Sequence, residues 1–218
     1  MQVELMTDVL GDNNAAAQQN QQLLADHNVL AVDLMGSPGC GKTSILEQVI
    51  QQLKGLAVRV IEGDVATAND AERIEAAGAE AFQINTGGMC HLNAPMVRRA
   101  MDKMDLASTD LLLIENVGNL VCPAAFKLGA QYRFVVCSIP EGDDKPEKYP
   151  VAFRTSQGVI LNKLDLIPHS PFDTEKFWDL CGQLQPEAVQ FATSCTTGKG
   201  ITELCQWLIE QHSQLTSA

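Results

Sequence analysis

The sequence has few basic residues and no long apolar run. Its 218 residues carry 15 Lys and Arg against 27 Asp and Glu, which gives a formal net charge of −12. Because a surface this acidic repels phosphate backbones, we expect no nucleic-acid partner. No apolar stretch approaches the length that a bilayer requires, so we expect no membrane span.

Targeting signals and a disulfide framework are also missing. The first residues, MQVELMTDVLGDNN, have no basic segment before an apolar stretch. This predicts a protein without a secretory signal and a cytoplasmic location. The seven cysteines are an odd number without regular spacing, which predicts reduced thiols. No repeat, low-complexity block or second-domain boundary is visible.

Apolar runs rich in Val, Ile and Leu alternate with amphipathic stretches. Their continuous apolar character is typical of strands buried on both faces of a parallel sheet. The predicted fold is therefore an α/β P-loop NTPase domain, with a mostly parallel, doubly wound sheet of about seven strands flanked by helices. The predicted strands are Val29–Leu34, Ala57–Ile61, Ala79–Ile84, Asp110–Ile114, Tyr132–Ser138, Gly158–Leu161 and Ala188–Ala192. The predicted helices are Asn14–Asp26, Lys42–Leu53, Ala94–Met104, Thr174–Gly182 and Ile201–His212.

The domain organisation follows from this alternation. We predict one domain over 1–218, with a helical extension over 1–28 and a nucleotide- and metal-binding core over 29–213. The polar segment Glu141–Pro150 (EGDDKPEKYP), punctuated by proline, is predicted to be a surface loop.

A phosphate-binding loop is the strongest motif. The segment GSPGCGKT, residues 36–43, fits the pattern of Gly, four residues, then Gly-Lys-Thr, between a predicted strand and a predicted helix. Glycines let consecutive N–H groups converge on phosphate oxygens. Lys42 can neutralise β- and γ-phosphate charge, and Thr43 can ligate Mg²⁺. The predicted nucleotide-binding residues here are Gly36, Gly39, Cys40, Gly41, Lys42, Thr43 and Ser44.

Two later loops predict that the base is guanine. Asn162, Lys163 and Asp165 follow a predicted strand in the segment NKLD. A carboxylate at Asp165 can accept hydrogen bonds from the guanine N1–H and exocyclic amine, which adenine cannot offer. The segment SCTTGKG, containing Cys195 and Thr196, resembles the loop that closes over guanine in P-loop GTPases. Taken alone, Asp165 would be read as a cap or turn residue.

Acidic residues at two strand ends are predicted to serve the phosphates and Mg²⁺. Asp64 follows one strand and Glu115 ends another, three residues before Gly118. We predict catalytic roles for Lys42, Asp64 and Glu115, Mg²⁺ contacts for Thr43, Asp64 and Glu115, and a γ-phosphate contact for the Gly118 N–H. Asp64 could instead be a solvated acid, and Glu115 could contact Mg²⁺ directly or through water.

Cys90, His91 and Cys122 are candidate ligands for a transition metal. They follow predicted strand ends, and thiolate with imidazole suits Ni²⁺ or Zn²⁺. Three ligands are few for a closed site, so two chains could share one. Residue types alone leave open a structural role for all three. Cys137, Cys181, Cys195 and Cys205 are predicted to fill the core.

Four segments together resemble one protein family. They are GSPGCGKT, Cys90-His91-Leu92, ENVGNLVCP (115–123) and DKPEKYP (144–150). The chain resembles the HypB family of hydrogenase nickel-incorporation GTPases, of the SIMIBI class. The resemblance implies a GTP-dependent homodimer with Cys90, His91 and Cys122 as ligands at its interface. It also implies a HypA-type accessory protein and a [NiFe] hydrogenase large-subunit precursor as partners.

The expected activity is hydrolysis of GTP to GDP, with slow intrinsic turnover because no glutamine or arginine finger is obvious. The N-terminus has neither the Cys-rich nor the His-rich tract of some family members. Its first cysteine is Cys40, and its only early histidine is His27. Two other functions stay open. One is service to another nickel enzyme such as urease, against which the 115–123 segment argues, and the other is a metal-regulated GTP-binding switch.

Overall fold

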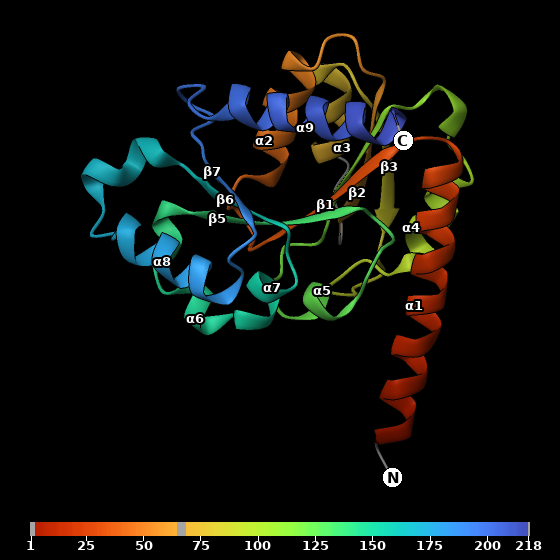
Figure 1. Cartoon of the computed structure of the whole chain (residues 1–218), viewed down its shortest axis with the longest axis horizontal. Helices are drawn as coiled ribbons and strands as arrows, with labels where there is room; N and C mark the ends of the chain where they lie inside the picture. Colours follow the sequence, from red (N-terminus) through yellow and green to blue (C-terminus); the bar gives the residue numbers. More distant parts are fainter. Residues whose placement is uncertain (1–2, 65–68, 218) are drawn as a thin grey trace.

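The computed structural model describes residues 3–64 and 69–217, and within them it leaves the side chains of residues 3–8, Asp64 and Asn69 undescribed. Its centre is a seven-stranded parallel sheet of order β3-β2-β4-β1-β5-β6-β7 (Figure 1). This arrangement is the predicted fold class. The strands are β1 (Leu30–Gly36), β2 (Val58–Asp64), β3 (Glu80–Asn85), β4 (Leu111–Glu115), β5 (Tyr132–Ser138), β6 (Gly158–Asn162) and β7 (Val189–Ala192).

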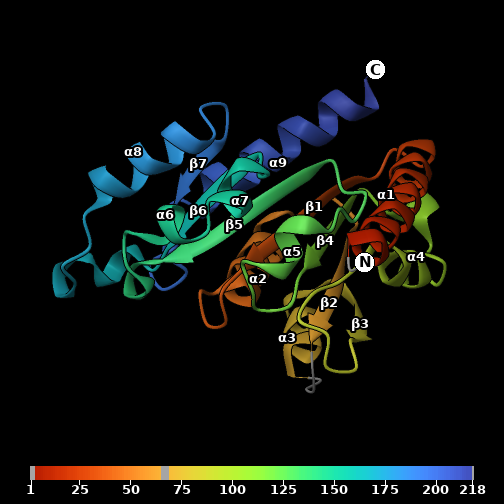
Figure 2. The same ribbon diagram turned by 90° about the horizontal axis from the view of Figure 1, so that it is seen from below.

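Helices cover both faces of the sheet (Figures 1 and 2). One face carries α2 (Lys42–Gln52), α3 (Asn69–Ala77) and α9 (Ile201–Thr216). The other carries α1 (Val3–Asp26), α4 (Ala94–Met101), α5 (Cys122–Ala125), α6 (Lys145–Lys148), α7 (Pro150–Arg154) and α8 (Thr174–Leu184). Single 3₁₀ turns lie at Leu106–Ser108 and Ile139–Glu141, and a longer one at Leu164–His169. In the described part of the chain, no helix has the length and apolar character needed to cross a bilayer.

The strands differ in burial according to their place in the sheet. Every residue of β1, β4 and β6 is buried, as the continuous apolar runs predict. β3 has only exposed and half-buried residues, because it is an edge strand with one neighbour. The prediction of burial on both faces is therefore wrong for β3, and also for β7 at the opposite edge.

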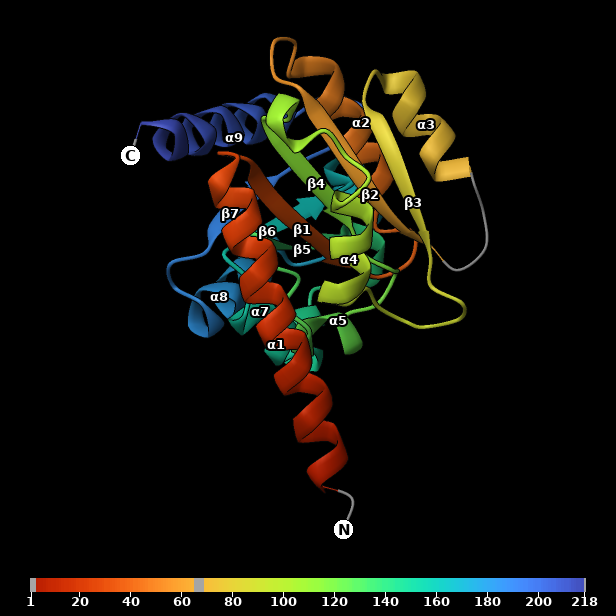
Figure 3. The ribbon, with the colours of Figure 1, turned by 90° about the vertical axis from the view of Figure 1, so that its right-hand side faces the viewer.

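Several helices differ from their predicted extents. The helix α1 begins at Val3, well before the predicted Asn14, and its first turns project beyond the sheet (Figure 3). The segment Glu141–Pro150 is not wholly a loop, because it contains α6. Three further helices, α3, α5 and α7, lie where none is predicted. α5, α6 and α7 have at most five residues each, too few to show a helical period.

The parallel order places the candidate residues together. Since β4 lies between β1 and β2, the carboxyl ends of these three strands meet at one edge of the sheet. In register, Glu115 is paired with Leu34 on one side and with Glu62 on the other. Successive side chains of a strand point to opposite faces of the sheet, so consecutive residues at this edge serve different faces.

Candidate nucleotide and metal site

A cavity of about 520 Å³ opens where β1, β2 and β4 end. The phosphate loop borders it, with Gly39 and Gly41 in left-handed conformations at φ of 74° and 101°. A Cβ at Gly41 would lie 2.4 Å from Asn162 Nδ2, so only glycine fits there. The lining residues are Pro38, Gly39, Gly41, Lys42, Thr43, Ser44, Glu62, Gly63, Asp70, Arg73, Glu115, Asn116, Val117, Gly118 and Lys163.

Lys42, Thr43 and Glu115 form one buried cluster at the start of α2. Lys42 Nζ lies 3.6 Å from Glu115 Oε1, and Thr43 Oγ1 donates to the same oxygen at 3.1 Å. The second oxygen, Glu115 Oε2, is buried and has no hydrogen-bond partner among the described residues. A carboxylate oxygen and a hydroxyl beside a phosphate cradle fit a hydrated Mg²⁺. The predicted Mg²⁺ role of Thr43 and Glu115 remains a prediction.

Glu62 is a site residue that the sequence reasoning missed. It pairs in register with Glu115, is 2% exposed and lines the cavity. Burial, followed by the charge of Glu115, raises the pKa of Glu62 to about 10. Burial also raises the pKa of Glu115, against the opposing charge of Lys42. Because both carboxyls are buried beside a single lysine, a cation bound here would favour the ionised form of each.

In the protein without nucleotide and Mg²⁺, Glu62→Gln is expected to raise stability increasingly as pH rises. Folded Glu62 holds a proton that the unfolded chain releases above its ordinary pKa of 4.5. The wild type therefore loses stability between that pH and about 10. Glutamine has no proton to release. The difference in free energy of unfolding between the variant and the wild type should therefore grow by about 1 kcal/mol per pH unit between pH 5 and pH 8. Urea unfolding of both proteins across this range measures it, and a constant difference would contradict the burial of an acid here.

Three further residues are predicted for the phosphate site: Gly118, Cys40 and Asp64. Gly118 lines the cavity, and a Cβ added to it would lie 2.8 Å from Pro38 Cγ. Cys40 is fully buried, and burial raises its pKa to about 11, so its side chain is a core residue and does not line the cavity. The Asp64 side chain lies outside the described residues, and its role stays a prediction.

An arginine that the sequence reasoning did not single out also lines the cavity. Arg73 donates to Glu47 Oε2 at 2.7 Å, to Asp70 Oδ1 at 3.0 Å and to Ser44 Oγ at 3.1 Å. Its guanidinium is therefore engaged by the protein's own side chains. Lys145, in the supposed loop, reaches the phosphate loop as well, with Nζ 3.2 Å from Ser37 Oγ. No short-range pattern marks Arg73, which lines the cavity from α3, whereas Lys145 stands in the DKPEKYP segment and reaches the phosphate loop from α6.

The predicted base-recognition residues adjoin the phosphate loop. Asn162 Nδ2 donates to Cys40 O at 3.1 Å and Lys163 Nζ to Gly39 O at 2.6 Å, so both brace the loop. Asp165 accepts a hydrogen bond from the hydroxyl of Ser194, in the loop after β7. The cavity lining includes Lys163 but not Gly36, Asn162, Asp165, Cys195 or Thr196.

The loop after β7 lies against the same strand end. Cys195 is half-buried, with Sγ 3.7 Å from Asn162 Oδ1, whereas Thr196 is exposed. A Cβ at Gly200 would lie 2.1 Å from Ala192 O, so a glycine is required where this loop enters α9. The two predicted base loops are therefore neighbours in space, and base recognition by them remains a prediction.

Cys90, His91 and Cys122 lie together although 32 residues separate the two cysteines. Their ligand atoms are all within 4.8 Å of one another, and within the described ranges no other group of at least three Cys, His, Asp or Glu has this geometry. Cys90 Sγ is 3.7 Å from His91 Nδ1, and the His91 ring packs on Phe126 with centroids 4.0 Å apart. Partial burial lowers the pKa of His91, which favours the neutral imidazole that binds metals.

The other cysteines have a different environment. Cys137, Cys181 and Cys205 are buried in the core, as predicted, and burial raises the pKa of each thiol. All seven cysteines are free. The cluster at Cys90, His91 and Cys122 thus holds one exposed and two half-buried ligands, which makes it accessible to a metal ion from solvent.

The parallel sheet, with a Gly-rich loop between β1 and the N-terminus of α2, defines a P-loop nucleotide-binding protein. Residues 30–192 match the CobW/HypB/UreG nucleotide-binding domain. The chain belongs to this family, and within it to the HypB hydrogenase maturation factors.

Three relatives illustrate the relationship. Hydrogenase maturation factor HypB of Escherichia coli K12 is 43% identical over 210 residues, which cover 96% of this chain and 72% of the relative. Hydrogenase/urease maturation factor HypB of Helicobacter hepaticus is 37% identical over 216 residues, covering 97% and 89%. The crystal structure of HypB from Helicobacter pylori in complex with nickel matches with a TM-score of 0.89 and 36% identity, covering 93% of this chain and 96% of that one.

Proposed function

We propose that this chain is a GTP-hydrolysing nickel metallochaperone that works with Mg²⁺ and assists nickel insertion into a [NiFe] hydrogenase. Nickel is its cargo, held by Cys90, His91 and Cys122. A HypA-type accessory protein and the hydrogenase large-subunit precursor are its partners. The crystal structure of the Helicobacter pylori relative, which is in complex with nickel, supports this choice of metal over zinc.

One loop borders both sites, and this observation carries the proposal. Val117 and Gly118 line the nucleotide cavity, and Cys122 follows only four residues after Gly118. A γ-phosphate that draws Gly118 closer must also shift Cys122 relative to Cys90. Metal affinity and nucleotide state are then reciprocally coupled. This is the behaviour required of a carrier that binds its cargo in one state and releases it in another.

The incomplete ligand set supports a homodimer. Three ligands with one exposed thiol leave a transition metal short of a closed shell, and a second copy of the cluster can supply the rest. The catalytic roles proposed for Lys42, Glu115 and Asp64 are to neutralise phosphate charge and to hold Mg²⁺ with its water. Among the described residues, Arg73 is the one arginine in the cavity lining, and it is engaged by Glu47 and Asp70, which supports slow intrinsic turnover.

Cys122→Ala is expected to weaken nickel binding by at least about 100-fold. It removes a ligand, and loss of an outer-shell partner alone typically costs 10–100-fold. GDP affinity of the metal-free protein should stay within about twofold, since Cys122 does not line the nucleotide cavity. Anaerobic titration with Ni²⁺ in GDP and in a non-hydrolysable GTP analogue measures both affinities.

Cys205→Ala is the matched control, because it removes a thiol that is buried far from the cluster between α9 and α2. Sedimentation of the same samples tests the dimer. A nickel-bound species that stays monomeric in both nucleotide states would contradict the shared site. Equal nickel affinity in both states would contradict the coupling.

Service to urease is the second candidate, because the Helicobacter hepaticus relative is named for both hydrogenase and urease. Nickel transfer from the loaded protein to each purified apo-enzyme precursor separates the two. A metal-regulated switch without delivery predicts no transfer to either.

A further inference from the structure

Three buried polar residues of the sheet and of the end of β4 bond to one another, and nucleotide binding does not explain these contacts. Asp33 is 1% exposed, Asn116 is 1% exposed and Arg133 is 8% exposed. Asp33 lies in the middle of β1, where every other residue is apolar or glycine. Neither Asp33 nor Arg133 lines the nucleotide cavity. A buried ion pair is costly to desolvate and is often no more stable than apolar residues, so stability alone does not account for it.

Arg133 holds the segment that carries Cys122. It is paired in register with Asp33, and its Nε donates to Asp33 Oδ2 at 2.9 Å. The guanidinium also donates to Ala124 O at 3.3 Å and to Phe126 O. α5 has four residues, too few to be stable by itself, and these carbonyls lie at its end. Arg133 therefore anchors α5, of which Cys122 is the first residue.

Asn116 holds the segment that carries Cys90 and His91. Its Oδ1 accepts from Leu92 N at 3.0 Å and from Val117 N at 3.1 Å. Its Nδ2 donates to Asp33 Oδ1 at 3.2 Å. Because Asn116 directly follows Glu115, these two adjacent side chains serve opposite faces of the sheet: Glu115 contacts Lys42, and Asn116 contacts Leu92.

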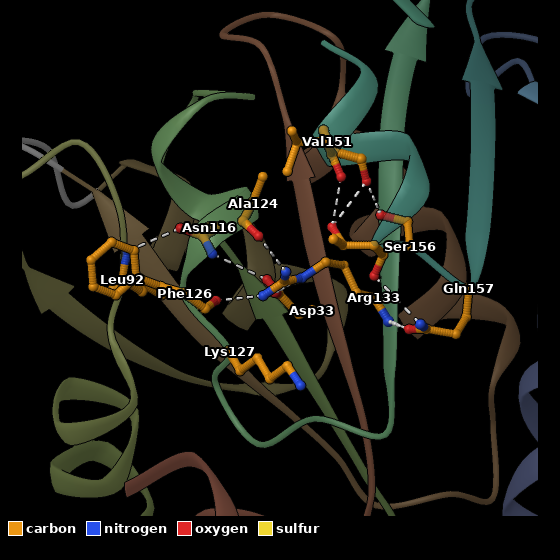
Figure 4. Close-up of polar contacts among 12 residues, drawn as sticks. Asp33, Leu92, Asn116, Ala124, Phe126, Lys127, Arg133, Val151, Ser156 and Gln157 are labelled. Carbon is orange, nitrogen blue, oxygen red and sulfur yellow. Dashed lines mark hydrogen bonds and ion pairs between the residues drawn. The ribbon is translucent and has the colours of Figure 1, made fainter. Parts of the chain in front are cut away.

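Asp33 links Asn116 and Arg133, because its Oδ1 accepts from Asn116 and its Oδ2 accepts from Arg133 (Figure 4). Between the two metal-bearing segments, His91 packs on Phe126 and Asn119 Nδ2 donates to Cys90 O at 3.3 Å. We propose that Asp33, Asn116 and Arg133 are positioning residues that hold Cys90 and His91 at chelating distance from Cys122. This inference rests on the proposed function, in which that cluster binds nickel.

The test removes the ion pair without leaving a buried charge, in the double variant Asp33→Leu/Arg133→Met. Nickel affinity in GDP, from the thiolate-to-nickel absorption band, is expected to fall about 10-fold to 100-fold. In metal-free protein, closure of a Cys90–Cys122 disulfide by a mild oxidant such as diamide is expected to slow at least fivefold. Leu208→Ala, which loosens the opposite face of the sheet, should leave both measurements unchanged.

Further variants keep the outcomes distinct. Asn116→Ala, which frees Leu92 N, should change both measurements in the same direction. If the double variant does not fold, Arg133→Lys replaces it, since a lysine presents its three donors from one point and does not reproduce the planar fork whose separate nitrogens reach Asp33 and the two carbonyls. A folded variant with parental nickel affinity, or with parental disulfide closure, overturns the positioning role. Cys122→Ala separates this from failure of the proposed function: parental nickel binding in that variant means that the cluster is not the metal site.

Discussion

Lys42→Ala is expected to lower nucleotide affinity and GTP turnover together, by at least about 100-fold each. Lys42 is 6% exposed and lies beside Glu115 in the cavity lining. Without it, the phosphates meet the buried carboxyls Glu115 and Glu62 with no lysine between them. Truncating one partner of a buried, hydrogen-bonded charge pair in a complex costs about 2–5 kcal/mol of binding free energy, and 3 kcal/mol already corresponds to more than 100-fold in affinity.

Equilibrium binding of fluorescent GDP and GTP analogues, with single-turnover hydrolysis, measures this effect. Lys54→Ala is the control, because Lys54 is an exposed lysine in the turn after α2. Loss of turnover with unchanged GTP affinity would contradict a ground-state role for Lys42 and place its contribution in the transition state alone.

Asp165→Asn is expected to weaken GTP by roughly 2–4 kcal/mol and to strengthen xanthosine triphosphate. The carboxylate can accept hydrogen bonds from both guanine donors, N1–H and the exocyclic amine. The asparagine amide can accept from only one of them, because its NH₂ group would face the other donor. Xanthine has a carbonyl at C2, which an amide donor satisfies. The hydroxyl of Ser194 donates to Asp165 Oδ1, which leaves Oδ2 and further lone pairs for the base.

Competition of GTP, xanthosine triphosphate and ATP against a fluorescent GDP analogue provides the measurement. Asp173→Asn is the matched control, since Asp173 caps α8 and lies outside the base loops. Unchanged GTP affinity in Asp165→Asn would remove Asp165 from the base site. Equal weakening of all three nucleotides would indicate a damaged loop and no base selection.

Local patterns predicted much of the fold. Tyr132–Ser138 is a strand at the predicted residues, and α2 and α4 begin at the predicted Lys42 and Ala94. These elements are recognisable because a buried strand needs a continuous apolar run and a helix start needs a cap or a glycine-rich turn. α3 was missed, although its first turn carries Asp70 and Glu72, because it has few apolar residues to show a period.

The candidate site was predictable where its residues form short motifs. The phosphate loop, the segment NKLD and the adjacent Cys90-His91 each stand within a few consecutive residues. Glu62 escaped notice because it stands in no recognised motif and lies two residues before Asp64, whereas Glu115 opens the ENVGNLVCP segment. Its importance arises from its register with Glu115, and that register depends on β2 being the neighbour of β4.

The sequence by itself determined the strands, the phosphate loop and the residue types offered to a metal, and it predicted two guanine-binding loops, since each depends on neighbours along the chain. Only the tertiary structure decided that Cys90 and Cys122 are close enough to chelate together, and that Asp33 faces Arg133 across 100 residues of sequence. The physical reason is the strand order. A parallel sheet makes neighbours of residues far apart in the chain, and burial there forces their polar groups to pair with one another.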